Sequence, residues 1–519
     1  MSHGAPYDVA VVGFGPSGAV AAGLLGALGL RTYVCERSRE VYDKPRAIAL
    51  DHEIVRLFQQ MGVLRAIEPH MEPFTDSVFY GVDGQAIKRM STVPEPYPLA
   101  HTPSLVFSQP PVEKILRAHA ASFQGVDVDL GQALTGLTQE TAGVTLHLQS
   151  DAGQASTVRA RHLIACDGAS STVRGLVGLA LDDLGFDEPW LVVDVLVNDR
   201  GLARLPATSV QYCNPTRPAT LVIGPGRHRR WEIAINPGED PKQVATPEGT
   251  WALLAPWLSP QEGQLWRQAS YRFHALVAQR WRAGHVFLAG DAAHQQPPFL
   301  GQGMCQGLRD VANLCWKLAA VIQGQARDAL LDTYGEERKG HVTELTTRIK
   351  GIGQIVGERD PARARARDQR LLEDCGGVVQ PTPRQDVQPA LARGLLSRAP
   401  HAARGTLFPQ PWLRVRGKSV RMDDVLGRGW RLVLSADADS GFELVAQAPM
   451  DQGLRVVRLG TPVFTEAHDV LTTWFRRHGV CAALVRPDHY VYGVASTPAE
   501  LASQCADLSA MRAEAAISR

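Results

Sequence analysis

The sequence predicts an α/β protein with a parallel-sheet domain, an antiparallel sheet inserted into it and a separate C-terminal unit. Three observations predict this architecture. An apolar strand, a glycine-rich turn and a helix open the chain, several short strands separated by turns fill residues 190–236, and a new alternation of strands and helices begins at residue 405. The 519 residues are too many for one ordinary core, so two or three domains are expected.

The N-terminal segment has the pattern of a Rossmann-like dinucleotide site. A valine-rich strand at residues 7–12 leads into the turn Gly13-Phe14-Gly15-Pro16-Ser17-Gly18, and a helix is expected over residues 19–30. The first glycine allows the tight turn, the second lets backbone N–H groups approach a pyrophosphate, and the third lets the helix pack on the sheet. A second strand ends at Glu36, whose carboxylate can accept hydrogen bonds from a ribose. This pattern alone does not separate FAD from NAD.

Two later segments have related patterns. In LIACDGASSTVR, residues 163–174, an apolar strand runs into Asp167-Gly168. In residues 286–318 another apolar strand runs into Gly290-Asp291, followed by a proline-rich turn and a helix whose apolar residues recur every three or four positions from Met304. Either motif alone would be an ordinary turn or helix cap. The three segments in this order are much more specific.

These motifs resemble those of the class A flavoprotein aromatic hydroxylases, the group that includes p-hydroxybenzoate hydroxylase and phenol hydroxylase. The resemblance extends over roughly the first 350 residues. It implies non-covalently bound FAD, NADH or NADPH as a transient co-substrate, and hydroxylation of a phenolic ring by O2 through a flavin hydroperoxide. It also implies a p-hydroxybenzoate hydroxylase-like fold, in which the inserted sheet roofs the substrate pocket. Within the group, the middle segment is most similar to the 3-(3-hydroxyphenyl)propionate hydroxylases, and this similarity implies a substrate like 3-(3-hydroxyphenyl)propionate.

The resemblance also implies particular contacts with FAD. The glycine turn and Glu36 would hold the ADP part, Asp291 the ribityl chain, and Asp167-Gly168 would lie near the pyrophosphate. The family has Asn where this chain has Cys305, which is a weaker hydrogen-bonding group. The predicted cofactor residues are Gly13, Gly15, Gly18, Glu36, Arg37, Arg46, Gln109, Asp167, Gly168, Gly290, Asp291, Pro298, Gly301, Gln302, Gly303 and Met304.

The inserted sheet supplies candidates for contact with the substrate. Strands are expected at residues 190–197, 208–213, 219–224 and 229–235. Arginine suits the carboxylate of a phenylpropionate, and the candidates are Arg217, Arg229 and Arg230. A phenol needs help in losing its proton, and the candidates for that role are Tyr212, His228 and His294. For each of these six residues the alternative, and the one favoured for any single residue, is a surface charge, a strand side chain or a satisfied histidine.

The same patterns predict the domain boundaries. The FAD-binding domain would comprise residues 1–75, 105–180 and 281–360, the substrate domain 76–104 and 181–280, and a linker 361–404. The unit 405–519 resembles the thioredoxin-like C-terminal domain of the phenol hydroxylase group, with a structural role or one in oligomer contacts. Its strands are expected at 430–435, 442–447 and 454–459, a helix at 466–479 and a strand pair at 481–494. Because no CxxC motif occurs, dithiol chemistry is not expected.

The composition disfavours several other function classes. Lys and Arg total 54 against 53 for Asp and Glu, so no basic excess points to nucleic acid. The eight cysteines lack zinc-site spacing, so no metal is expected, and the longest apolar run, 18–30, is too short to cross a membrane. A cytoplasmic protein is therefore expected. The homodimer, the exact substrate and the choice of NADH or NADPH stay open, as do a polyketide-tailoring or other FAD oxidoreductase and a non-catalytic flavin redox sensor.

Overall fold

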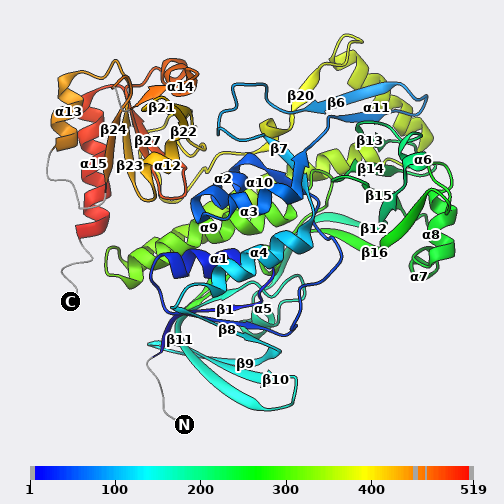
Figure 1. Ribbon diagram of the computed structural model, residues 1–519, viewed down its shortest axis with the longest axis horizontal. Helices are drawn as coiled ribbons and strands as arrows, with labels where there is room; N and C mark the ends of the chain where they lie inside the picture. The colour runs from blue at the N-terminus through cyan, green and yellow to red at the C-terminus, as the bar shows by residue number, and fades with distance from the viewer. Residues whose placement is uncertain (1–5, 448–453, 462–463, 514–519) are drawn as a thin grey trace.

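The computed structural model describes residues 6–447, 454–461 and 464–513, and its centre is a parallel sheet (Figure 1). This eight-stranded sheet has the order β17-β18-β11-β1-β2-β8, with β10 and β9 attached beside β11. In the three central strands, each last residue pairs with the last residue of the neighbouring strand, so they end together at one edge. The strands are β1 (Tyr7–Val12), β2 (Thr32–Glu36), β8 (Val126–Leu130), β9 (Gln132–Glu140), β10 (Gly143–Ser150), β11 (Ala155–Ala165), β17 (Arg282–Ala283) and β18 (Val286–Leu288).

Helices pack beside this sheet and connect it to the rest of the molecule. The helix α1 (Pro16–Ala27) contacts both α4 (Gln109–Ala121) and α9 (Gly303–Ile322). The long α10 (Asp332–Gly357) contacts α9 and also the inserted antiparallel sheet. Shorter helices are α2 (His52–Met61), α3 (Leu64–Ile67) and α5 (Thr172–Leu176), and a small sheet combines β3 (Ala49–Asp51), β4 (Met71–Pro73) and β7 (Ser104–Phe107).

The inserted sheet has nine strands in the order β19-β16-β12-β15-β14-β13-β5-β6-β20. The four strands predicted between residues 190 and 236 are confirmed as β12 to β15. Trp231 and Ile233 point to the outer face, where they pack in one apolar cluster with Leu254 of α8 (Pro247–Leu254). The strands are β5 (Ser77–Tyr80), β6 (Ala86–Ser91), β12 (Leu181–Val197), β13 (Ser209–Tyr212), β14 (Ala219–Ile223), β15 (His228–Ala234), β16 (Gly263–Ala278), β19 (His294–Gln295) and β20 (Pro381–Pro383), and α6 (Asp199–Leu202) and α7 (Pro241–Val244) complete the region.

The segment 361–404, expected as a linker, carries more structure than that word implies. It forms α11 (Pro361–Asp374), and β20 extends the inserted sheet beside β6. Two charges of α11 are buried: Arg367 donates to the carbonyl of Cys213 at 3.0 Å, and Asp368 accepts from the amide of Val82 at 2.7 Å. Such pairing with distant backbone groups is not visible in a charge-rich sequence. None of the described helices is long and apolar enough to cross a bilayer.

The C-terminal unit lies on the opposite side of the parallel-sheet domain from the inserted sheet (Figure 1). Its four-stranded sheet has the order β24-β23-β26-β27, with β23 and β24 parallel and the other pairs antiparallel, which confirms the thioredoxin-like prediction. The elements are β21 (Trp412–Val415), β22 (Lys418–Arg421), α12 (Met422–Leu426), β23 (Arg431–Leu434), α13 (Ser440–Gln447), β24 (Arg455–Arg458), β25 (Thr465–Glu466), α14 (Val470–His478), β26 (Ala482–Val485), β27 (Val491–Ala495) and α15 (Pro498–Ala513).

The strand predicted at residues 442–447 is wrong, because this segment forms helix α13. The short apolar run does not separate a strand from a buried helix. The spacing of its core contacts does, since Phe442, Val445 and Ala446 join one apolar cluster at positions i, i+3 and i+4. Asp439 also accepts from the amide of Gly441 at 2.8 Å, which satisfies a donor at the start of the helix.

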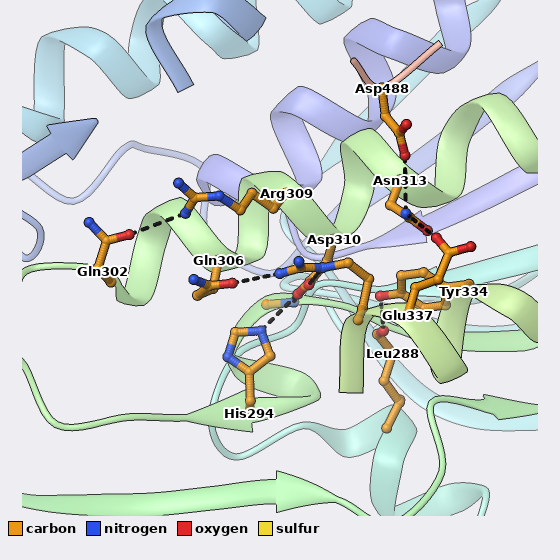
Figure 2. Close-up of polar contacts among 12 residues, drawn as sticks. Leu288, His294, Gln302, Gln306, Arg309, Asp310, Asn313, Tyr334, Glu337 and Asp488 are labelled. Atoms are coloured by element: carbon orange, nitrogen blue, oxygen red, sulfur yellow. Dashed lines mark hydrogen bonds and ion pairs between the residues drawn. The ribbon is translucent and has the colours of Figure 1, made fainter. Parts of the chain in front are cut away.

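Buried ion pairs hold the C-terminal unit against the parallel-sheet domain. Glu337 of α10 accepts from Lys317 of α9 at 2.8 Å and from Arg486 of the C-terminal unit at 2.7 Å, and all three side chains are fully buried. Asn313 donates to both Glu337 and Asp488, as Figure 2 shows. Burial alone would raise the pKa of Glu337, but the two cations outweigh it and lower this pKa to about 2. The interface therefore depends on charges that compensate one another.

Candidate active site

The glycine turn after β1 has the shape that a close backbone approach requires. A Cβ on Gly13 would lie 2.4 Å from the carbonyl oxygen of Cys166, and one on Gly18 would lie 1.9 Å from that of Gly13. A Cβ on Gly15 would meet no atom within 4 Å in the described part of the chain. The first and third glycines are therefore needed for packing, whereas the second leaves the backbone open to a ligand.

Two helix N-termini next to this edge lack side-chain caps among the described residues. They are the starts of α1, preceded by Gly15, and of α9, preceded by Gln302. In contrast, α2 is capped by Asp51, which accepts from the amide of Ile54. Free N–H groups and the helix dipole favour negative charge. The two termini fit the pyrophosphate and the pyrimidine edge of an FAD molecule.

Acidic side chains hold the turns at the sheet edge in place. Glu36 accepts from the amide of Phe14 at 2.8 Å. Asp167 accepts from the hydroxyl of Ser171 at 2.6 Å and from the amide of Val173 at 3.1 Å, while Gly168 after it has a positive φ of 84°. Arg37 is exposed beside Glu36. These contacts hold the turns in place. The contacts of Glu36 and Asp167 with FAD stay predictions.

A buried polar network, part of which Figure 2 shows, holds the turn after β18 in place. Asp310 of α9 accepts from the amide of Gly290 at 2.9 Å and from Arg338 at 2.9 Å, and its other contact is the Nε2 atom of His294 at 2.7 Å. Burial disfavours ionisation of Asp310, but His294 and Arg338 outweigh it and lower the pKa of the carboxyl. Asp291 itself is exposed. His294 therefore supports the turn after β18 through its contact with Asp310.

Two further loops carry predicted cofactor residues and touch each other. Gln109 is buried, and its Oε1 atom accepts from the amides of Ala47 at 2.6 Å and Arg46 at 3.2 Å, so it fixes the loop that exposes the Arg46 side chain. In the second loop, partly exposed Pro298, Gly303 and Met304 flank Gly301, whose Cβ would lie 2.7 Å from that of Ala49.

The side chains of Gln302 and Cys305 point elsewhere. The Oε1 atom of Gln302 accepts from Arg309 at 3.2 Å and from Gln388 at 2.8 Å, so this oxygen is already engaged within the protein. The buried thiol of Cys305 lies 3.8 Å from the carbonyl oxygen of Ala49. Replacement of the family's Asn by Cys therefore falls at a position that packs against the Ala49 loop.

We call the face of the inserted sheet opposite to α8 its inner face. Three of the six substrate candidates lie away from this face or already bond to other groups of the protein. The ring of Tyr212 lies 5.3 Å from that of Trp257, on the outer face with α8. Arg217 forms a two-point ion pair with Glu239, at 2.6 and 2.7 Å. Arg229 donates to the carbonyls of Gly226 and His228 in its own hairpin. Strand alternation and local pairing separate these side chains from the position expected for a substrate.

Arg230 and His228 do lie on the inner face, where both contact Asp194. Arg230 donates to Asp194 at 2.7 and 3.1 Å, and the Nε2 atom of His228 is 2.7 Å from the same carboxylate. Arg230 also donates to the carbonyls of Arg46 at 2.7 Å and Pro45 at 3.1 Å. The arginine thus connects the inserted sheet to the loop of Arg46 and is ion-paired with Asp194, whose Oδ2 atom also lies 3.6 Å from Arg267.

Glu232 is an inner-face residue that the sequence reasoning missed. It pairs with Thr220 on β14 and Val192 on β12, and its side chain is only 4% exposed. Next to it, the hydroxyl of Thr220 donates to Gln211 at 2.5 Å. The alternation in HRRWEIA could have revealed it, since Arg230 and Glu232 must share a face when Trp231 and Ile233 share the other.

Comparisons with known proteins agree with this geometry. The family described as "FAD binding domain" matches residues 6–349, and "HcaD C-terminal domain" matches residues 405–511. A protein of Rhodococcus jostii (strain RHA1) named "Probable NADH-specific resorcinol 4-hydroxylase" is 35% identical, over 97% of this chain and 94% of its own. A "3-(3-hydroxy-phenyl)propionate/3-hydroxycinnamic acid hydroxylase 2" of Burkholderia vietnamiensis (strain G4 / LMG 22486) is 32% identical, over 93% of each chain.

A solved structure shares the whole fold. The flavin-dependent monooxygenase PieE, crystallised with FAD and substrate, superposes with a TM-score of 0.81 over 98% of this chain and 100% of its own, at 22% identity. The parallel sheet, the inserted sheet and the C-terminal unit therefore recur together in one arrangement.

Proposed function

This chain belongs to the FAD-dependent aromatic hydroxylases, and on that premise we propose that it uses NADH and O2 to hydroxylate a phenol with a second substituent in the meta position. The two relatives compared above are named for resorcinol and for 3-(3-hydroxyphenyl)propionate, and both compounds are meta-substituted phenols. NADH is proposed because the resorcinol relative is named as specific for it. Bound FAD supplies the activated oxygen, and the protein orients the ring and excludes water.

The observation that carries the proposal is the polar inner face of the sheet between the two cofactor loops. Glu232, Gln211 and Thr220 offer hydrogen-bonding groups for a hydroxyl there. The three arginines considered for a carboxylate are engaged: Arg217 with Glu239, Arg230 with Asp194, and Arg229 with carbonyls of its hairpin. An anionic side chain would find no unpaired cation among them. A neutral second substituent, as in resorcinol, fits this face best.

A second candidate substrate, a phenylpropionate, is favoured by Arg384. Its guanidinium carbon lies 4.2 Å from the ring centre of Phe74, and the group donates to the carbonyl of Leu300 at 3.0 Å. In the described part of the chain no carboxylate forms an ion pair with it, and it lines a cavity of about 210 Å³ next to Ala49 and Gln302. A carboxylate could pair with it there.

The test is substrate-dependent oxidation of NADH and NADPH by the purified yellow protein, with mass analysis of the products. Resorcinol, 3-(3-hydroxyphenyl)propionate and unsubstituted phenol form the panel. We expect one added oxygen in resorcinol, coupled to NADH consumption, and a weaker response to phenol. Formation of only hydrogen peroxide with all three compounds would overturn the proposal. A cytoplasmic location and a homodimer are separate predictions, and size measurement in solution tests the dimer.

A further inference from the structure

The side chain of Glu232 is almost entirely buried, and its carboxyl group lacks a partner among the residues that the structure describes. It is 4% exposed, and no described residue forms a hydrogen bond or ion pair with it. A buried carboxylate without such a partner is costly. A ligand that donates a hydrogen bond or a proton would complete the site.

Its position relative to the two cofactor loops is fixed by its neighbours along β15. Two residues before it, Arg230 donates to the carbonyl of Arg46. Two residues after it, Ala234 belongs to the same apolar cluster as Phe299 and Leu300. Alternate residues of a strand point to the same face and lie about 7 Å apart. Glu232 therefore lies between the loop of Arg46 and the loop that contains Pro298 and Gly301.

We propose that Glu232 is the catalytic base that accepts the proton of the substrate's hydroxyl group. The inference rests on the proposed function. The O–H bond of the phenol breaks, its electron pair stays on the oxygen, and the proton forms a new O–H bond on the carboxylate. The resulting phenolate makes the ring more electron-rich, so it reacts faster with an electrophilic oxygen. After product formation the carboxylic acid returns its proton to the product or to water.

The surrounding charges suit a group that exchanges a proton near neutral pH. Burial raises the pKa of Glu232 to about 7, Arg230 opposes this shift and Asp194 adds to it. The effect of Arg230 on Glu232 is weakened because Arg230 is ion-paired with Asp194. The charged or titratable groups of the neighbouring elements are His228 and Arg230 on β15, Asp194 on β12, Arg267 and Tyr271 on β16, and Arg46 in its loop.

The experiment compares Glu232→Gln with the wild-type holoenzyme on two phenols. One is resorcinol, and the other is a fluorinated resorcinol that is already largely ionised at the assay pH. Glu188→Gln is the matched control, because Glu188 is a half-buried acid of the same sheet that accepts from the indole of Trp190. The pH dependence of kcat/KM and of resorcinol binding, followed by flavin absorbance, is measured for each protein.

We expect Glu232→Gln to lower kcat/KM for resorcinol by about 100-fold and to remove its rise near pH 7, while the ionised phenol loses less than about tenfold. The control should retain the wild-type pH profile. Equal losses on both phenols would show a structural role and overturn the proposal, as would unchanged turnover of resorcinol. If the wild-type enzyme hydroxylates no phenol at all, the proposed function fails together with this inference, whereas the preceding two results leave that function intact.

Discussion

Replacing Glu232 by glutamine should change the stability of the holoenzyme in a way that depends on pH. Because burial raises the pKa of the carboxyl from 4.5 to about 7, the folded protein binds this proton more tightly than the unfolded chain does. The resulting stabilisation is fully present below pH 4.5 and is lost as the pH rises through 7. A glutamine does not titrate, so the variant lacks this dependence.

The size of the effect follows from the same two pKa values. Each tenfold change in proton affinity corresponds to about 1.4 kcal/mol, so the gap between 4.5 and about 7 corresponds to about 3 kcal/mol in full. Between about pH 5.5 and about pH 8, the free energy of unfolding of the variant should rise by about 2 kcal/mol relative to wild type. A constant offset from packing of the amide cancels in this comparison.

The assay is thermal unfolding followed by the flavin fluorescence that appears when FAD is released, since this signal reports on the domain that contacts Glu232. The difference between the variant's midpoint and the wild-type midpoint should grow by a few degrees from about pH 5.5 to about pH 8. Glu248→Gln, an exposed acid on α8, is the control and should show no such trend. A difference that stays constant across this range would refute the reasoning that burial controls the ionisation of Glu232.

Three other predictions test the cofactor site, the interface and the substrate. Gly15→Ala should fold normally yet bind FAD at least about tenfold more weakly in a fluorescence titration, and tight FAD binding by this variant would contradict the prediction. Gly18→Ala should instead reduce the yield of folded protein, because its Cβ would lie 1.9 Å from a carbonyl oxygen. Glu337→Gln should destabilise the protein by about 3–5 kcal/mol in thermal unfolding, since it leaves buried cations under-compensated, and an unchanged midpoint would contradict this. Arg384→Met should keep resorcinol turnover within about threefold but lower any turnover of 3-(3-hydroxyphenyl)propionate by about 10- to 100-fold in steady-state assays; equal effects on both substrates would exclude a carboxylate contact.

The sequence predicted the parts of the fold that depend on local pattern. Valine-rich β1, the glycine turn and the spacing along α9 each combine a clear period with turn residues, and all three elements are present. The pattern was insufficient at 442–447, where the short, mostly apolar segment FELVAQ suited strand and helix equally. It was also insufficient at Arg367 and Asp368, whose partners lie more than 150 residues away in the chain.

The candidate site was predictable in outline but not in its polar detail. The order of the three motifs indicated that they meet, and the register of the parallel strands explains why they do. The roles of individual charged residues depended on partners that no spacing reveals: Arg230 pairs with Asp194, and His294 with Asp310. Strand alternation alone could have placed Glu232 on the inner face. That no described residue bonds to its carboxyl group could be known only from the structure.

On the inner face of the inserted sheet, the pairing of Arg230 with Asp194 explains why Glu232, rather than this arginine, is left to act on the hydroxyl group of the substrate. Arg230 is ion-paired with Asp194, and Arg338 is ion-paired with Asp310. The hydrogen bonds of both arginines therefore hold groups of the protein in place. In a site that excludes water, creating a new charge is costly. Transfer of a proton from a phenol to Glu232 creates none, because the negative charge only moves from the carboxylate to the phenol oxygen. A neutral substrate can thus become electron-rich at the moment of reaction while the total charge of the pocket stays constant.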